Sequence, residues 1–165
     1  MKDVKINRET FISHKTTAIS KEYTLGKQLG TGAFGAVRLA VHKATKQTRA
    51  VKVLKKTKEN VQWILDEIHI LSTLSHPNIM QIFEVFEDQT NYYIVSERCK
   101  GGELFDVISQ KGNFTEKDAA IVMKQLLSGI CYSHQNHIVH RDLKPENILM
   151  DNQANDLAIK IIDWG

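Results

Sequence analysis

The spacing of apolar residues changes near Asn60, and this change restricts the possible fold more than any other feature of the sequence. Over residues 23–54 apolar and polar residues alternate, and two turn-forming segments divide this stretch into three parts. This pattern predicts three consecutive strands. Over residues 60–75 the apolar positions recur every three or four residues, as on one face of a helix of about four turns. Two further strands are predicted at 81–86 and 92–95. The pattern therefore indicates an α+β fold with five strands and one main helix in this half of the chain.

The second half of the chain is mainly helical in its pattern. A short helix is predicted over 103–110, ending at Gly112, and a longer one runs to about His134. A capping-box variant, Thr115 to Asp118, marks the start of the longer helix. Its apolar stripe consists of Ala119, Val122, Met123, Leu126, Leu127 and Ile130. Short strands at 148–150 and 158–162 flank a polar turn at 151–156.

Composition excludes several classes of protein. The 165 residues are 42% hydrophobic and 25% charged with a net charge of +3, as in soluble globular proteins and unlike collagenous or disordered chains. No apolar run approaches the ~20 residues that span a bilayer, and the N-terminus has neither an apolar signal region nor a glycine at position 2. The two cysteines, Cys99 and Cys131, are too few for a disulfide framework. We therefore expect one cytoplasmic domain that contacts no membrane.

The excess of positive charge does not by itself indicate nucleic-acid binding. The basic cluster between Lys43 and Lys58 has no interleaved aromatic residues, so a solvated face is the better interpretation. The histidines His134, His137 and His140 recur at every third position, but no carboxylate follows at ligand spacing, so a metal site there is disfavoured.

Three glycines, Gly30, Gly32 and Gly35, separate the first two predicted strands. Glycines at this spacing let the backbone approach phosphate groups and point N–H groups at them. The signal is weak alone, because glycine-rich hairpin turns are common.

Lys52 is a charged residue inside the apolar strand pattern of Ala50 to Leu54. One interpretation places it at a solvent-facing or edge position of the sheet. The other places its ammonium under the glycine-rich turn, where it would hold two phosphates and pair with Glu67 of the following helix. Glu67 could equally be a surface carboxylate.

The segment from His140 to Asn147 is polar and lies between two apolar pairs, which predicts a loop between short strands. Asp142 could accept a hydroxyl proton and Lys144 could neutralise phosphoryl charge. Asn147 and Asp163 offer oxygen atoms to a hard cation such as Mg²⁺. A solvated surface loop without function remains an alternative for the segment taken alone.

In combination these elements resemble the protein kinase family, because a glycine-rich loop, a strand lysine, a helix glutamate, a catalytic loop and a metal aspartate occur in that order. The loop sequence His-Arg-Asp-Leu-Lys-Pro-Glu-Asn is similar to that of serine/threonine kinases. The segments beginning at Tyr23, His76, Tyr92 and Gly101 look most like calcium-dependent and calmodulin-dependent kinases, of protist type.

The resemblance implies a kinase-like architecture over about residues 20 to 165. It implies an N-terminal arm at residues 1–21 and an antiparallel five-stranded N-lobe at 22–95. A hinge at 96–102 and a partial, mainly helical C-lobe at 103–165 would follow. The arm shows neither period and is expected to be flexible or loosely docked.

The resemblance also implies ATP and Mg²⁺ as cofactors and a protein substrate with serine or threonine, in a basic context. The residues that it assigns to nucleotide binding are Leu29, Gly30, Gly32, Gly35, Val37, Ala50, Lys52, Glu67, Glu97, Cys99, Glu103 and Leu149. Asp142 would be the catalytic base, with Lys144 and Lys52 contacting phosphates, and Asn147 and Asp163 would bind Mg²⁺.

Some features depart from the family pattern. Trp164 replaces the usual phenylalanine, and we expect it to pack against Leu71, Ile82 and His140; Ser96 replaces a larger residue, which predicts an enlarged pocket behind the adenine. The sequence contains no EF-hand loop.

The resemblance also stops before an activation loop and the later helices of the family, so the 116–134 helix is expected to expose Val122, Leu126 or Ile130 and to associate through that surface. The rival readings are therefore a nucleotide-binding or interaction fragment without turnover, and a truncated product that does not fold.

Overall fold

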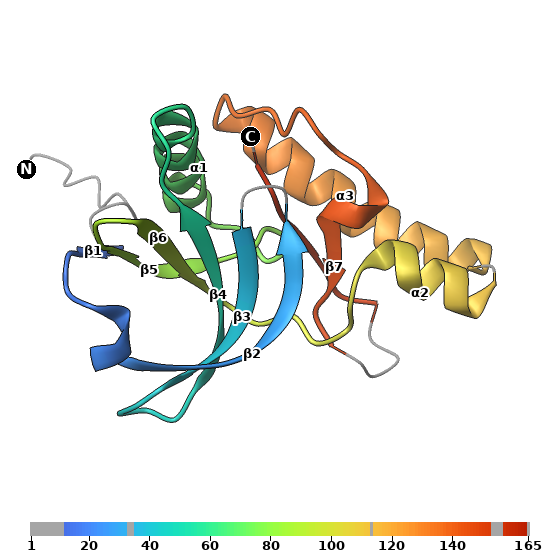
Figure 1. Cartoon of the computed structure of the whole chain (residues 1–165). Helices are drawn as coiled ribbons and strands as arrows, with labels where there is room; N and C mark the ends of the chain where they lie inside the picture. Colours follow the sequence, from blue (N-terminus) through green and yellow to red (C-terminus); the bar gives the residue numbers. More distant parts are fainter. Residues whose placement is uncertain (1–11, 33–34, 113, 153–156, 165) are drawn as a thin grey trace, which may run out of the picture. The chain divides into compact units, whose positions relative to one another are not determined.

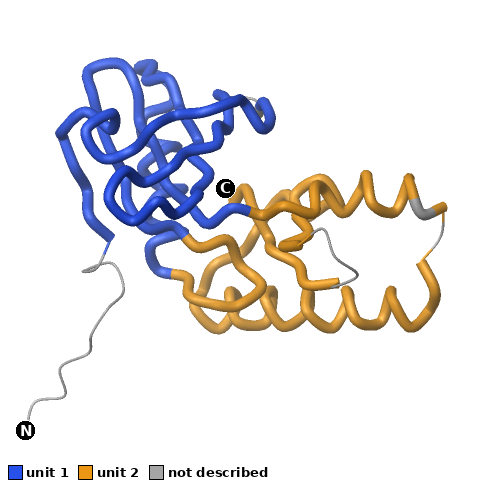
Figure 2. Tube along the Cα trace, turned by 90° about the horizontal axis from the view of Figure 1, so that it is seen from below, with its two compact units in different colours: residues 1–73, 82–98 blue, residues 74–81, 99–165 orange. Residues whose placement is uncertain are grey.

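The computed structural model describes residues 12–32, 35–112, 114–152 and 157–164. The tip of the glycine-rich turn at 33–34, most of the polar turn at 151–156, Gly165 and most of the predicted arm lie outside these ranges. The chain forms two compact units, shown in Figure 2. Unit 1 consists of residues 1–73 and 82–98, and unit 2 of residues 74–81 and 99–165. Each is described by itself.

Unit 1 is a six-stranded sheet with one helix on one face, as Figure 1 shows. The strand order is β1-β5-β6-β4-β3-β2. The strands are β1 (Ser13–Lys15), β2 (Tyr23–Gly32), β3 (Gly35–His42), β4 (Thr48–Lys55), β5 (Ile82–Glu87) and β6 (Asn91–Ser96). The five predicted strands are all present and pair antiparallel with one another.

The sixth strand, β1, corrects the expectation of a purely antiparallel sheet and shows that part of the arm, expected to be flexible or loosely docked, pairs with it. Ser13–Lys15 pairs in parallel with β5, so the sheet is mixed. The 3₁₀ helix η2 (Ile19–Lys21) follows, and Ile19 is buried. Three residues are too few to show a period of two, and their partner lies about seventy positions later, which is why the sequence pattern did not indicate a strand.

Helix α1 (Val61–Thr73) begins at a reciprocal cap. The Asn60 backbone N–H donates to the Thr57 side chain, and the Thr57 N–H donates to the Asn60 side chain. Ile64 and Leu71 are buried at the spacing of one helix face, and Glu67 lies on the same buried face. The helix therefore carries a carboxylate into the interior of unit 1.

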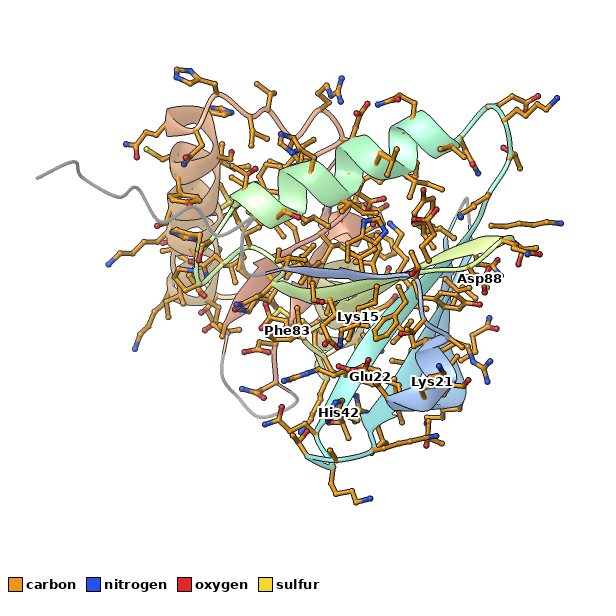
Figure 3. All side chains as sticks on the ribbon, turned by 90° about the vertical axis from the view of Figure 1, so that its left-hand side faces the viewer. Lys15, Lys21, Glu22, His42, Phe83 and Asp88 are labelled. Carbon is orange, nitrogen blue, oxygen red and sulfur yellow. The ribbon has the colours of Figure 1, made fainter. Side chains whose placement is uncertain are left out.

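The opposite face of the sheet has its own core, because side chains alternate along β4 and place Val51 on the side away from Lys52. Val51 packs there with Tyr23, Phe86 and Val95. Lys15, Glu22 and His42 also lie on this side of the sheet, away from α1 (Figure 3).

Unit 2 combines two helices with a short hairpin. Its elements are α2 (Leu104–Lys111), α3 (Glu116–Gln135), the 3₁₀ helix η3 (Pro145–Asn147), β7 (Ile148–Met150) and β8 (Ile159–Ile161). The two strands are antiparallel and pair Ile148 with Ile161. A core of Leu104, Val122, Ile148, Met150 and Ile159 joins the helices to the hairpin.

The start of α3 confirms the predicted cap, because the Thr115 side chain accepts a hydrogen bond from the Asp118 N–H. The expectation that Val122 is exposed is wrong: it is 4% exposed, since it packs against the hairpin. Leu126 and Ile130 are half-buried, and the large apolar residues of α3 that are exposed are Ile121, Met123 and Leu127. No helix in the described ranges is long and apolar enough to cross a bilayer.

Candidate active site

The glycine-rich turn joins β2 to β3, and its glycines serve different purposes. Gly30 pairs with Val37 and Gly32 with Gly35 across the hairpin. A Cβ atom at Gly35 would lie 1.8 Å from the Val53 carbonyl oxygen, so the sheet itself requires glycine there. A Cβ at Gly30 would meet nothing within 4 Å. Gly30 therefore leaves open space next to the backbone, as a phosphate-binding turn needs.

Lys52 lies on a central strand, which overturns the interpretation of an edge position. β4 is paired on both sides, and Lys52 stands opposite Val37 of β3 and Ile94 of β6. Its ammonium is 2.7 Å from Oε1 of Glu67. The Lys52 side chain is 22% exposed and that of Glu67 only 2%. The predicted pair therefore exists, with a buried carboxylate that fixes a partly accessible cation.

The residues assigned to the nucleotide base lie in both units. In unit 1, Leu29 is 40% exposed beside an irregularity in β2, Val37 is half-buried in β3, and Ala50 is buried in β4. Glu97, also in unit 1, is half-buried just after β6.

In unit 2, Cys99 is half-buried and Glu103 is the exposed residue that precedes α2. The Glu103 backbone forms an isolated bridge with that of Leu149 in β7. These two predicted residues are therefore neighbours.

Asp142 is held by two of the other predicted residues. Lys144 Nζ donates to Asp142 Oδ2 at 2.7 Å, and Asn147 Nδ2 donates to the same oxygen at 3.1 Å and to the Asp142 carbonyl at 2.8 Å. The hydrogen bond from Lys144 is the main reason why the pKa of Asp142 lies below its usual value, and Asn147 adds to it. The Asp142 side chain is 61% exposed. An ionised, oriented and accessible carboxylate results.

The His140 ring is neutral and holds this loop through hydrogen bonds at both of its nitrogen atoms. Burial lowers the pKa of His140, although its hydrogen bond to Ile162 acts in the opposite direction. Nδ1 accepts from the Asp142 N–H at 3.3 Å, so the proton is on Nε2, which donates to the Ile162 carbonyl at 2.8 Å. The Trp164 ring, fully buried, lies 4.6 Å from the His140 ring, as predicted for that pair. Leu71 and Ile82 belong to unit 1 and Trp164 to unit 2.

Two loop residues have strained backbones. Arg141 has φ of 68° and Asp163 has φ of 56°, a region that non-glycine residues rarely occupy. Such conformations persist only where surrounding contacts enforce them, and they concentrate at functional sites.

The hairpin brings the two predicted metal ligands to the same end. Asn147 precedes β7 and Asp163 follows β8, and the Ile162 N–H donates to the Asn147 carbonyl at 2.9 Å. The two bonds from Nδ2 fix the Asn147 amide, so Oδ1 is the atom that it can offer to a cation. An amide oxygen and an exposed carboxylate suit Mg²⁺, which takes few protein ligands and completes its shell with phosphates and water.

In the described ranges no group of three or more His, Cys, Asp or Glu side chains could hold a metal ion by itself. A metal bound through Asn147 and Asp163 would therefore need ligands from a phosphate group or from water.

One part of the site has a role that was not predicted from the sequence. Residues 78–80 extend the hairpin of unit 2, since Ile79 bridges in parallel to Ile161. Asn78 and Gln125 connect this segment to β8. Neither motif nor periodicity singled out Gln125, and Asn78 was noted only within the family-like segment that begins at His76.

Comparison with known proteins agrees with this geometry. Residues 23–165 match the family described as the protein kinase domain. The chain is 45% identical, over 98% of its length, to calcium-dependent protein kinase 4 of Plasmodium berghei. Over 84% of its length it is 48% identical to calcium-dependent protein kinase 5 of Plasmodium falciparum. It spans 31% and 24% of those two proteins, respectively.

Two further similarities extend beyond these parasites. The chain is 45% identical, over 93% of its length, to the SNF1-related protein kinase catalytic subunit alpha KIN12 of Arabidopsis thaliana, of which it spans 31%. A solved structure of a twitchin kinase fragment from C. elegans superposes with a TM-score of 0.83 at 33% identity. That match covers 93% of this chain and 34% of the other.

Proposed function

Because this chain belongs to the protein kinase family, we propose that it transfers the γ-phosphate of Mg·ATP to serine or threonine hydroxyls of a protein substrate with basic residues near the acceptor. The observation that carries the proposal is the Asp142 carboxylate, which is exposed yet held by Lys144 and Asn147. Phosphoryl transfer requires mainly positioning and charge neutralisation, and this loop offers both.

Asp142 acts on the acceptor hydroxyl. Its lowered pKa keeps it ionised at neutral pH, so it orients the hydroxyl by accepting its hydrogen bond. It receives the proton as the bond from the hydroxyl oxygen to the γ-phosphorus forms and the bond from that phosphorus to the bridging oxygen of ADP breaks, so that ADP leaves. Lys144, whose pKa is raised chiefly by its hydrogen bond with Asp142, stays charged and offsets the negative charge of the phosphoryl group.

The nucleotide is held by groups from the glycine-rich turn and β4. Gly30, Gly32 and Gly35 offer backbone N–H groups to the phosphates, and Lys52, fixed by Glu67, binds them with its ammonium. Asn147 and Asp163 would hold Mg²⁺, which neutralises the phosphate charge when bound. The apolar residues would contact the adenine ring: Leu29, Val37, Ala50 and Leu149. Glu97 and Cys99 would contact the edge of the adenine, and Glu103 would contact the ribose.

A second candidate function is nucleotide-dependent association without turnover. It is favoured by the large apolar side chains that α2 and α3 expose: Phe105, Ile121, Met123 and Leu127 are 40–59% exposed. In that case Mg·ATP binds through the same residues, but no phosphate is transferred.

Transfer of labelled phosphate separates the two functions. The chain is incubated with Mg²⁺, γ-labelled ATP and three basic peptides that differ only in a central serine, tyrosine or alanine. We expect label on the serine peptide alone, and a rate about 10²–10⁴-fold lower for Asp142→Asn, as for loss of a general base. Asp106→Asn, an exposed aspartate on α2, serves as the matched control.

Two outcomes would overturn parts of the proposal. Label on the serine peptide at equal rates in wild type and Asp142→Asn would remove Asp142 from the chemistry. A wild-type chain that binds Mg·ATP but labels no peptide would leave the second candidate function.

A further inference from the structure

Strand β8 sets the position of Asp163, yet its own ladder is short. It pairs with β7 through only three residue pairs, and Asp163 follows its last residue by two positions. A slip of one residue would move the strand by about 3.3 Å and exchange its two faces. One backbone hydrogen bond extends the ladder at each end, from the Ile162 N–H to the Asn147 carbonyl and from the Asp151 N–H to the Ala158 carbonyl. Contacts from outside the hairpin add to this short ladder in fixing the register, which decides where the candidate metal ligand lies.

Gln125 of α3 makes four hydrogen bonds, which is the full capacity of its amide group. Its Oε1 accepts from the Ile159 N–H at 3.2 Å and from Asn78 Nδ2 at 3.0 Å. Its Nε2 donates to the Leu157 carbonyl at 2.8 Å and to the Ile121 carbonyl at 3.2 Å. The amide thus binds the backbone on both sides of residue 158, and it does so from the middle of a twenty-residue helix.

Asn78 completes the clamp on the other edge of β8. Its Nδ2 also donates to the Ile159 carbonyl at 3.2 Å, and its own carbonyl accepts from the Ile161 N–H at 2.8 Å. The Met80 N–H then donates to the Ile161 carbonyl at 3.0 Å. β8 is therefore held along one edge by β7 and along the other by residues 78–80.

Gly129 explains how α3 comes close enough for Gln125 to reach. It lies four residues after Gln125, on the same face of the helix. A Cβ atom at Gly129 would be 2.8 Å from Cδ1 of Ile161 and 3.7 Å from the Asn78 carbonyl oxygen. The bare backbone of Gly129 thus contacts one end of β8 while the Gln125 amide binds the other.

We propose that Gln125 is a positioning residue that fixes the register of β8, and through it the place of Asp163, for binding of metal-loaded nucleotide. The metal part of this inference rests on the proposed function, whereas the register part rests on the hydrogen bonds alone. An apolar side chain of similar length at position 125 would fill the space but leave the Ile159 N–H and the Leu157 carbonyl without their partner.

The first test measures amide hydrogen exchange in the whole chain. We compare wild type with Gln125→Leu and with Gln135→Leu, a matched control because Gln135 is exposed near the end of the same helix. We expect faster exchange at Ile159 and Ile161 in Gln125→Leu only, with α1 unchanged. Wild-type protection of both amides in Gln125→Leu would overturn the proposal.

The second test measures nucleotide binding with Mn²⁺ as the probe. Binding of Mn·ATP is followed by electron paramagnetic resonance, and binding of ATP in excess EDTA by calorimetry. We expect Gln125→Leu to bind Mn·ATP about tenfold more weakly, the lower end of the range for residues that orient metal ligands, with metal-free ATP unchanged. Equal losses with and without metal would overturn a role through Asp163.

Two situations need a further readout. If Gln125→Leu does not fold, Gln125→Glu replaces it. The Glu carboxylate can still accept from the Ile159 N–H but cannot donate to the Leu157 carbonyl, so we expect the Ile159 amide to stay more protected than the Ile161 amide. Equal loss of protection at both amides would contradict the role of the hydrogen bond to Ile159. If the wild-type chain binds no Mn·ATP, the proposed function fails, and hydrogen exchange decides the register claim on its own.

Discussion

Glu67 is the one acidic side chain of α1 that is buried, and Lys52 is the cation beside it. We expect Lys52→Met to lower the free energy of unfolding by roughly 1–3 kcal/mol, because it leaves the buried carboxylate without this cation; the partial exposure of Lys52 keeps the loss below that of a fully buried pair. The double variant Lys52→Met/Glu67→Met should be more stable than Lys52→Met, because it removes both charges of the buried pair and not the cation alone.

Urea unfolding of these variants measures both effects. Lys58→Met, which changes an exposed lysine of the segment before α1, is the control and should match wild type. The single variant Glu67→Met completes the set. A double variant whose loss of unfolding free energy equals the sum of the losses in Lys52→Met and Glu67→Met would contradict an ion pair between the two residues.

Ser96 ends β6 and is half-buried, with its hydroxyl donating to the Glu97 carbonyl. The small side chain predicts room behind the adenine. We expect Ser96→Met to lower the affinity for an ATP-competitive inhibitor with an added bulky aryl group by at least about tenfold, because methionine fills that space. The affinity for ATP should change little. Equal inhibitor affinities in the two proteins would show that no such space exists.

Strand β1 is attached to the sheet by ion pairs as well as by its short ladder. Lys15 Nζ lies 2.6 Å from Glu22 Oε2 and 2.7 Å from Glu84 Oε1, and the Tyr23 hydroxyl donates to Glu84 Oε2 at 2.6 Å. We expect Lys15→Met to lower stability by about 1 kcal/mol and to speed exchange in β1, because it removes two charge-assisted bonds that are partly exposed. Lys21→Met, in the same segment and exposed, is the control (Figure 3).

The stability difference between wild type and Lys15→Met should depend on pH. Burial acts to raise the pKa of Glu84, but hydrogen bonds from Lys15 and Tyr23 outweigh it and the pKa lies below its usual 4.5. A carboxyl group with a lowered folded-state pKa stabilises the fold above its unfolded-state value and loses this contribution as the pH falls through the folded-state value. The difference should thus be constant above about pH 5.5 and shrink in acid. A difference that grows on acidification would contradict this assignment.

Most elements could be predicted from the sequence because each has an apolar period of its own. The strands β3 to β6, the helices and the β7–β8 hairpin follow from that pattern within about two residues, whereas β2 continues to Gly32, into the segment that was predicted as a turn. β1 could not, since three residues have no period and pair with a distant strand. The pairing of β4 on both sides was also hidden, because alternation shows which residues share a face and not which strand is central.

The candidate site divides in the same way. Lys52, Glu67, Asp142 and Asn147 were predicted because their order along the chain matches a family pattern, and the structure places Lys52 against Glu67 and Asp142 against Asn147. Gln125 was not, because a glutamine in an amphipathic helix looks like any other polar position. Only the backbone groups that it meets reveal a role.

For the molecule as a whole, the exposed apolar side chains of unit 2 predict self-association. Leu127 is 59% exposed and Met123 47%. We expect a sedimentation coefficient that rises with protein concentration, and less so in Leu127→Lys, because a charge on this surface opposes its burial. Gln135→Lys is the control for added charge on the same helix. Identical concentration dependence in wild type and Leu127→Lys would show that this surface does not mediate association.

Both candidate functions require that this chain hold Mg·ATP through the glycine-rich turn and the Lys52–Glu67 pair. The most direct measurement is calorimetric titration of wild type, Lys52→Met and Lys58→Met with Mg·ATP. We expect wild type and Lys58→Met to bind Mg·ATP with the same affinity. Lys52→Met should bind it about tenfold more weakly or worse, as for loss of a charge-assisted contact to phosphate. Equal affinity in all three proteins, or no binding by wild type, would contradict this mode of binding.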